Sequence, residues 1–112
     1  MNLRKREREK EGVRWEGLIR SFRVEDMGEF KVVRKAEGKA PWGGRIEVEV
    51  HETEIDYSII VSLPEQGGRI LALLDANDWE IWITPRNEIH VVRPNRKLPN
   101  GYPPTEYLML TE

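Results

Sequence analysis

The order of hydrophobic and polar residues along this chain is typical of a β-protein. Apolar and polar residues alternate from Arg45 to His51, with Ile46, Val48 and Val50 on one side, and the alternation resumes from Ile55 to Leu63. A period of two places successive side chains on opposite faces of an extended strand. Both segments are therefore predicted to be half-buried strands.

Strand patterns recur about every ten to twelve residues, with turn-forming residues between them. Turns are predicted at residues 64–68, 75–78 and 85–88, and a Gly- and Pro-rich loop at 37–44. This spacing predicts a mainly β fold, a small antiparallel β-barrel or sandwich of about six to eight strands. The predicted strands cover residues 29–34, 45–51, 55–63, 69–74, 79–84, 89–93 and 106–110.

The first part of the chain has a different pattern. Residues 1–12 alternate in charge and contain almost no apolar side chain, which predicts a charged N-terminal helix or arm ahead of a single β domain at 13–112. Residues 13–22 fit a strand of a first hairpin that turns at 26–28. They also fit a helix, because Trp15, Leu18, Ile19 and Phe22 have helical spacing. The pattern leaves both open, and the helical alternative reduces the sheet to six strands.

The last part of the chain combines a proline-rich segment with a short apolar one. Residues 94–104 contain four prolines and are predicted to run extended over the surface. Residues 106–110 then form a terminal strand. Such a strand either closes a sheet edge or pairs with another subunit, because an exposed strand offers unpaired backbone groups.

Two tryptophans three residues apart, Trp79 and Trp82, must point to opposite faces of their strand. A five-residue loop at 84–88 places Trp82 opposite His90 and keeps the aliphatic residues on one face, whereas a four-residue loop splits them. We therefore expect Trp79 in the core and Trp82 on the other face. The predicted core comprises Val24, Phe30, Val32, Ile46, Val48, Val50, Tyr57, Ile59, Val61, Ile70, Leu73, Trp79, Ile81, Ile83 and Val91.

Trp82 has two explanations. It is either an exposed stacking platform or contact centre for a partner, or it packs beneath the N-terminal helix or the proline-rich segment. Trp42, between small residues of a loop, is either an exposed contact residue or a lid over one end of the fold. The predicted binding residues are these two tryptophans, His90 and nearby basic side chains, namely Trp42, Trp82, Arg86, His90, Arg93, Arg96 and Lys97.

Composition limits the class of protein further. A chain of 112 residues with 38% hydrophobic content is long enough for one domain. The absence of cysteine excludes disulfides, thiolate metal sites and cysteine nucleophiles, and it favours a cytoplasmic protein. No apolar run approaches the roughly 20 residues of a membrane span. Charged residues make up 34% of the chain and thermolabile types are scarce, which favours a thermophilic source.

The chain offers little catalytic chemistry. Glu49 and His51 would point to the same side of a strand and form part of a metal set, but Thr53 interrupts the series. We expect a solvated acidic face instead, without metal or cofactor. No serine lies in a nucleophile-elbow motif, and no glycine-rich phosphate loop precedes a helix. A metal-dependent hydrolase is the third functional hypothesis.

The favoured hypothesis is a non-enzymatic interaction or assembly subunit. It would bind a protein partner, or form a homo-oligomer, through exposed aromatic residues and the terminal strand. The alternative is a single-stranded nucleic-acid binder that uses an aromatic and basic sheet face. A net charge of −2 argues against a general polyanion binder.

Overall fold

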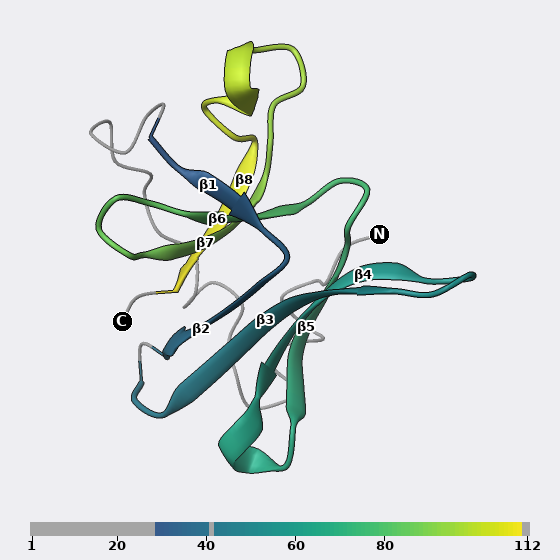
Figure 1. Cartoon of the computed structure of the whole chain (residues 1–112), viewed down its shortest axis with the longest axis vertical. Coiled ribbons are helices and arrows are strands. Elements are labelled where there is room, and N and C mark those ends of the chain that lie inside the picture. The colour runs from purple at the N-terminus through teal and green to yellow at the C-terminus, as the bar shows by residue number, and fades with distance from the viewer. Residues whose placement is uncertain (1–28, 41, 111–112) are drawn as a thin grey trace.

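The computed structural model of the chain describes residues 29–40 and 42–110. These residues form eight strands in two antiparallel sheets, which confirms the mainly β prediction (Figure 1). The arrangement is sandwich-like rather than a closed barrel. The predicted charged segment 1–12 and the two alternatives for 13–22 lie outside the described residues. The strands are β1 (Lys31–Val33), β2 (Lys35–Lys39), β3 (Arg45–Glu52), β4 (Tyr57–Leu63), β5 (Arg69–Asp75), β6 (Glu80–Ile83), β7 (Ile89–Arg93) and β8 (Glu106–Leu110).

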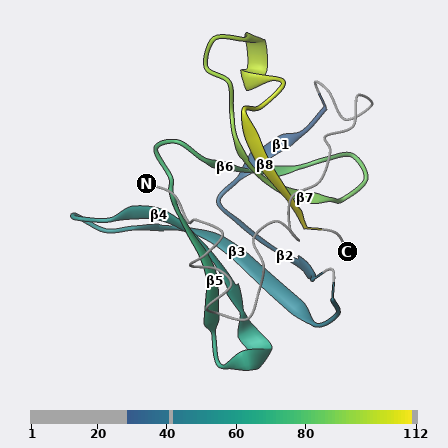
Figure 2. The same cartoon turned by 180° about the vertical axis from the view of Figure 1, so that it is seen from behind.

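We call the two sheets A and B. Sheet A has the order β1-β6-β7-β8 and sheet B the order β2-β3-β4-β5. Only the bend at Arg34 separates β1 from β2, so one extended segment crosses from sheet A to sheet B. Both views show the sheets as separate layers, with β8 in one and β5 in the other (Figures 1 and 2). In these orders β1 and β8 are the edge strands of sheet A, and β2 and β5 are the edge strands of sheet B.

The main core lies between the sheets. The inward sides of β3 and β4 contribute Ile46, Val48, Ile59 and Val61, which are fully buried. Trp79 packs in the same cluster, as predicted. Burial of each large aliphatic side chain contributes about 1.5–3 kcal/mol, so this cluster dominates the stabilisation of the fold. Sheet A supplies the opposing layer with Ile81, Ile89, Val91, Leu108 and Leu110.

Strand β2 is longer than the sequence suggested. Residues 37–39 belong to the strand rather than to the predicted loop at 37–44, and Glu37 pairs with Glu47 of β3. Hydrogen bonding to an alternating neighbour strand outweighs the low strand propensity of Gly38. The turn that remains is closed by a hydrogen bond from the Ala40 amide to the Gly44 carbonyl, 3.0 Å long.

Strand β5 contains a bulge that corrects the predicted core. Val61 of β4 pairs with Ala72, but the next residue of β4, Ser62, pairs with Ile70, so Leu71 is an extra residue. Leu71 and Ala72 are both buried, which leaves Ile70 and Leu73 on the outer face. The prediction that these two lie in the core is wrong. Val32, the middle residue of β1, and Tyr57, the first residue of β4, were also predicted as core and are exposed.

The hairpin of β6 and β7 has the preferred register. Trp82 pairs with His90, Ile81 with Val91 and Ile83 with Ile89, as the five-residue loop requires. The Thr84 hydroxyl accepts the Glu88 backbone N–H at 3.2 Å, and the Thr84 amide donates to the Glu88 carbonyl at 3.1 Å. These bonds fix the loop length, and with it the register of the sheet.

Residues 94–104 do not run extended, which corrects the prediction. The Asn95 amide donates to the Gly101 carbonyl at 2.9 Å, and a short 3-10 turn, η4 (Pro99–Gly101), closes the loop. A positive φ at Gly101 and a local turn replace the extended course that the prolines suggested. The chain then returns as β8 and pairs with β7, so the predicted terminal strand at a sheet edge is confirmed.

Candidate interaction surface

Trp82 lies under residues of its own chain. Its ring stacks on Phe30 with centroids 3.8 Å apart and planes 6° apart, and Tyr102 of the proline-rich loop stacks at 6.0 Å. The indole is fully buried, and Val92 lies in the same cluster. Trp82 is thus on the face predicted for it, but it is not an exposed platform. The explanation in which the proline-rich segment covers it holds instead.

A polar contact ties the same cluster to the loop above it. The Trp82 indole N–H donates to the Glu80 carboxylate at 2.9 Å, which satisfies a donor that burial removes from water. The other Glu80 oxygen lies 3.6 Å from the Arg96 guanidinium, and Arg96 also donates to the Asn77 carbonyl at 3.1 Å. Arg96 therefore anchors its loop, although its side chain is 61% exposed.

His90 is also internal. It is fully buried beside Trp82 in the sheet, and its Nε2 atom lies 3.3 Å from the carboxylate of Glu88. His90 and Glu88 are both buried, so neither ring nitrogen of His90 is available to contact a partner at the surface. The predicted aromatic pair of Trp82 and His90 exists, but as a second buried layer of sheet A.

The remaining predicted contact residues are exposed and dispersed. Arg93, Arg96 and Lys97 flank the end of β7, whereas Arg86 lies in the hairpin loop at the opposite end of that strand. Trp42 is 47% exposed, at the turn between β2 and β3 in the other sheet. The structure therefore does not bring the seven predicted residues together into one site.

A shallow hollow lies beside the Trp82 cluster. It has a volume of about 380 Å³, and Phe30, Val32, Arg96 and Leu98 contribute to its lining. Val32 and Leu98 expose apolar surface there. The one cation in the lining, Arg96, already contacts the Glu80 carboxylate, so the hollow presents little free positive charge.

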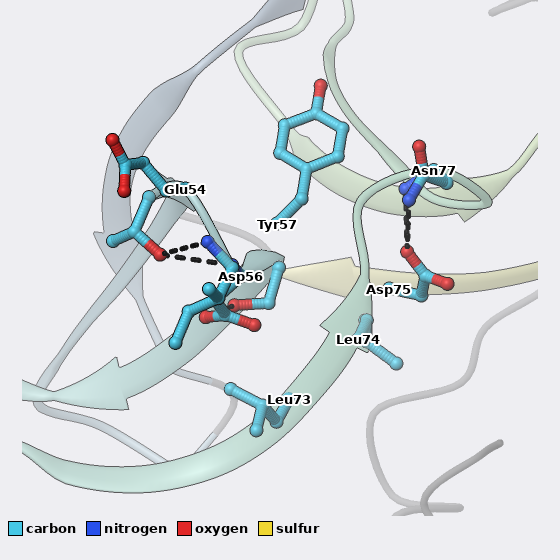
Figure 3. A pocket seen from close by; sticks show the side chains of 10 residues that line it. Glu54, Asp56, Tyr57, Leu73, Leu74, Asp75 and Asn77 are labelled. Atoms are coloured by element: carbon cyan, nitrogen blue, oxygen red, sulfur yellow. Dashed lines mark hydrogen bonds between the residues drawn. The ribbon is translucent and has the colours of Figure 1, made fainter.

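A larger hollow of about 590 Å³ lies between the β3–β4 loop and the end of β5 (Figure 3). Glu54, Asp56, Tyr57 and Asp75 surround it, and two of its carboxylates, Asp56 and Asp75, accept hydrogen bonds from nearby side chains. Asp56 accepts the Ser58 hydroxyl at 3.1 Å, and the Asp75 carboxylate accepts the Asn77 amide. The hollow is acidic and open, and its polar contacts serve to shape the loop.

The residues near this hollow do not form a nucleophile arrangement. His51 lies 3.5 Å from Asp56, the same carboxylate that accepts the Ser58 hydroxyl. Activation of a serine requires the hydroxyl to donate to the imidazole, whereas here the serine and the histidine both contact the carboxylate. Among residues 29–40 and 42–110, no group of three or more His, Asp or Glu side chains is placed to hold a metal ion.

Two large aliphatic side chains of β5 are exposed on one face of the strand. Ile70 and Leu73 are 46% and 48% exposed, and their β4 partners Ser62 and Ile60 lie on the same outer face of sheet B. No strand of the described range pairs with the outer edge of β5. We call Ile60, Ile70 and Leu73 the β5 patch. It combines apolar side chains with the backbone groups of a free sheet edge.

No family description, curated protein or solved structure matches this chain. Within the described part of the chain, no helix has the length and apolar character needed to cross a membrane.

Two features of these surfaces were not predicted from the sequence. Phe30 was expected in the core, but it packs with Tyr102 over Trp82; the two residues lie far apart in the sequence and meet only after β1 and the proline-rich loop are placed. The β5 patch was missed because Ile70 to Leu74 is a continuous apolar run, and such a run does not reveal which side chains point outward. The spacing of three between Ile70 and Leu73 becomes informative only once the bulge is known.

Proposed function

We propose that this protein is a non-enzymatic interaction or assembly subunit that associates with protein through the outer face of sheet B at β5. The observation that carries the proposal is the exposure of Ile70 and Leu73, at 46% and 48%, on an outward face beside a free strand edge. Apolar side chains next to unpaired backbone groups favour strand addition, since both can be buried in one contact.

The surroundings of the patch fit a protein interface. Ile60 lies beside Leu73 in the ladder and is partly buried, while Glu47 and Glu49 of β3 border the patch on its far side. An apolar centre with a polar rim is the common arrangement of protein contacts. The favoured hypothesis of an interaction subunit is kept, but its contact moves from the Trp82 face to β5.

Strand β8 and Trp42 support the proposal to a smaller extent. β8 also borders a sheet, yet its last three residues, Leu108, Met109 and Leu110, are already buried. It offers backbone groups with little free apolar surface. Trp42 is exposed but isolated on a turn, so it can extend a contact rather than form its centre.

A double substitution of the patch tests the proposal. In Ile70→Lys/Leu73→Lys the outer face of β5 becomes charged, whereas Val32→Lys makes the same kind of change at an exposed valine of sheet A. We expect the natural protein to run in solution above the 13.2 kDa of one chain, alone or with a co-purifying protein, and the double variant to run as one chain. The Val32→Lys control should keep the larger mass.

Light scattering after size-exclusion chromatography gives the mass, and protein staining identifies any second chain. A natural protein that stays at 13.2 kDa over a wide concentration range, without a co-purifying chain, contradicts the proposal. Binding of an oligonucleotide at low salt that weakens steeply with added salt would instead favour the nucleic-acid alternative, because released counterions cause that dependence.

A further inference from the structure

We infer that the occupant of the β5 edge is β5 of a second copy of this chain, paired antiparallel so that Ile70 of each copy faces Leu73 of the other. This inference rests on the proposed function and names its partner. The evidence is the bulge in β5, because it fixes which side chains of the strand point to which face.

The inward and outward positions of β5 are symmetric about the bulge. Leu71 and Ala72 are buried, Ile70 and Leu73 on either side of them are exposed, and Leu74 beyond is buried again. Arg69, at the other end, is partly buried. A two-fold axis between Leu71 and Ala72 therefore maps each outward position onto an outward one. An interface between identical copies requires such a self-complementary pattern.

Only one long register keeps every pair on a common face. In an antiparallel pair, directly opposed residues lie on the same side of the sheet. Centring the pair between Leu71 and Ala72 places Ile70 opposite Leu73, and Leu71 opposite Ala72, of the second copy. A shift by one residue in either direction opposes an inward residue to an outward one, since the bulge breaks the alternation of β5.

The same bulge disfavours a regular strand as the occupant. A regular strand alternates strictly, so it cannot match two successive inward residues, and bulges protect sheet edges for this reason. A second β5 carries the same irregularity at the matching position. The edge is thus selective for a copy of itself over an unrelated extended peptide.

The side chains are also compatible with self-pairing. Charged residues occur only at the strand ends, as Arg69 and Asp75, and the chosen register does not oppose like charges. Ile70 and Leu73 of the two copies would gather into one apolar group on the outer face, next to Ile60 of each copy. Pairing therefore buries the surface that one copy leaves exposed.

Engineered cysteines test the register directly, because the chain has no cysteine of its own. Opposed residues of an antiparallel pair have Cα atoms about 4.5–5.5 Å apart, within the range that a disulfide spans. Ile70 and its own counterpart would be offset by three residues, roughly 10 Å along the strand, which is too far. The same holds for Leu73 and its counterpart.

The experiment mixes Ile70→Cys protein with Leu73→Cys protein under mild oxidation, and it oxidises each variant alone as the control. We expect a covalent dimer from most of the mixed pairs and almost none from either variant alone. Crosslinking of a single variant, or a dimeric mass without the mixed crosslink, overturns the inference. Both substitutions are at exposed positions, and circular dichroism verifies that each variant is folded.

A second pair of variants gives an independent readout. Ile70→Lys/Leu73→Lys and Ile70→Glu/Leu73→Glu should each be monomeric, because like charges meet across the axis, and their mixture should recover the dimer mass. Failure to recover it overturns the inference. A larger species that contains a different chain also overturns it, but leaves the proposed function standing; a lone 13.2 kDa species contradicts both.

Discussion

The outer faces of the two sheets both carry apolar side chains, but most of these are buried on sheet A, and those at β5 of sheet B are about half exposed. On sheet A, Trp82, His90 and Val92 are fully buried, and Phe30 and Tyr102 pack over Trp82 in the middle of the face. On sheet B, Ile70 and Leu73 are about half exposed. Apolar character on a strand face therefore does not say whether the chain itself or a second molecule covers that face.

The difference arises from the connections rather than from the strands. The loop between β7 and β8 folds back over sheet A through Tyr102, and the residue before β1 adds Phe30. The connection on either side of β5 is short, a 3-10 turn η3 (Pro64–Gln66) on one side and the turn after Asp75 on the other. Short turns cannot reach across a sheet, so among the residues that the structure describes neither connection covers the outer face at β5.

Removal of Trp82 should have the largest effect. Trp82→Ala deletes a fully buried indole and its stacking on Phe30, and we expect a loss of about 3–5 kcal/mol in the free energy of unfolding. Trp42→Ala is the control at a half-exposed indole, with an expected change within about 0.5 kcal/mol. Urea denaturation measures both. Equal losses would show that the face of sheet A is not closed by its own chain.

Neighbouring leucines of β5 sharpen the comparison within one strand. Leu74→Ala creates a cavity in the core and should destabilise by about 2–5 kcal/mol. Leu73→Ala removes an outward side chain and should change the stability of the monomer by about 0.5 kcal/mol or less. Thermal unfolding at low protein concentration separates the two. A large effect of Leu73→Ala under these conditions would place Leu73 in the core and contradict the bulge.

Gly101 tests how tightly the loop over sheet A is folded. A Cβ atom there would lie 2.6 Å from the Pro94 Cβ, and Gly101 also has a φ of 71°. Gly101→Ala should therefore cost about 1–2 kcal/mol for the backbone conformation, plus about 1 kcal/mol or more for the clash. Gly67→Ala has a φ of 70° without a close neighbour and serves as the control. Matching losses, measured by chemical denaturation, would rule out the clash.

The smallest effect concerns Glu80 beneath the same loop. Glu80→Ala removes the acceptor of the buried Trp82 N–H and should destabilise by about 1–3 kcal/mol. Glu80→Gln keeps an acceptor and loses only the partly exposed ion pair with Arg96, so about 0.5 kcal/mol or less is expected. Denaturation curves compare the two variants. If Glu80→Gln lowers the free energy of unfolding as much as Glu80→Ala does, the charge of Glu80 rather than its hydrogen bond stabilises the Trp82 cluster.

Much of the fold followed from local patterns. The alternation in β3 and the turn residues before β5, β6 and β7 predicted those strands within a few residues. The pairing of Trp82 with His90 was predictable because loop length and the aliphatic face agree on one register. The strand status of residues 37–39 was not, because the stabilising contact with β3 lies outside the segment itself.

The candidate contact surface was far less predictable. The sequence correctly separated Trp79 from Trp82, but the covering of Trp82 depends on Phe30 and Tyr102, which come from distant parts of the chain. The exposure of Ile70 depends on one extra residue in β5 opposite β4. Both outcomes are set by how segments meet, and single-strand periodicity contains no information about that.

By itself, the sequence determined a mainly β protein, the register of the Trp82 hairpin and the presence of a terminal strand. Periodicity and turn chemistry are local properties, and they act within each segment before the segments meet. Only the tertiary structure decided which apolar side chains the described residues bury and which they leave exposed. That choice depends on long-range packing of a loop on sheet A and on a bulge in β5 that aims Ile70 and Leu73 outward.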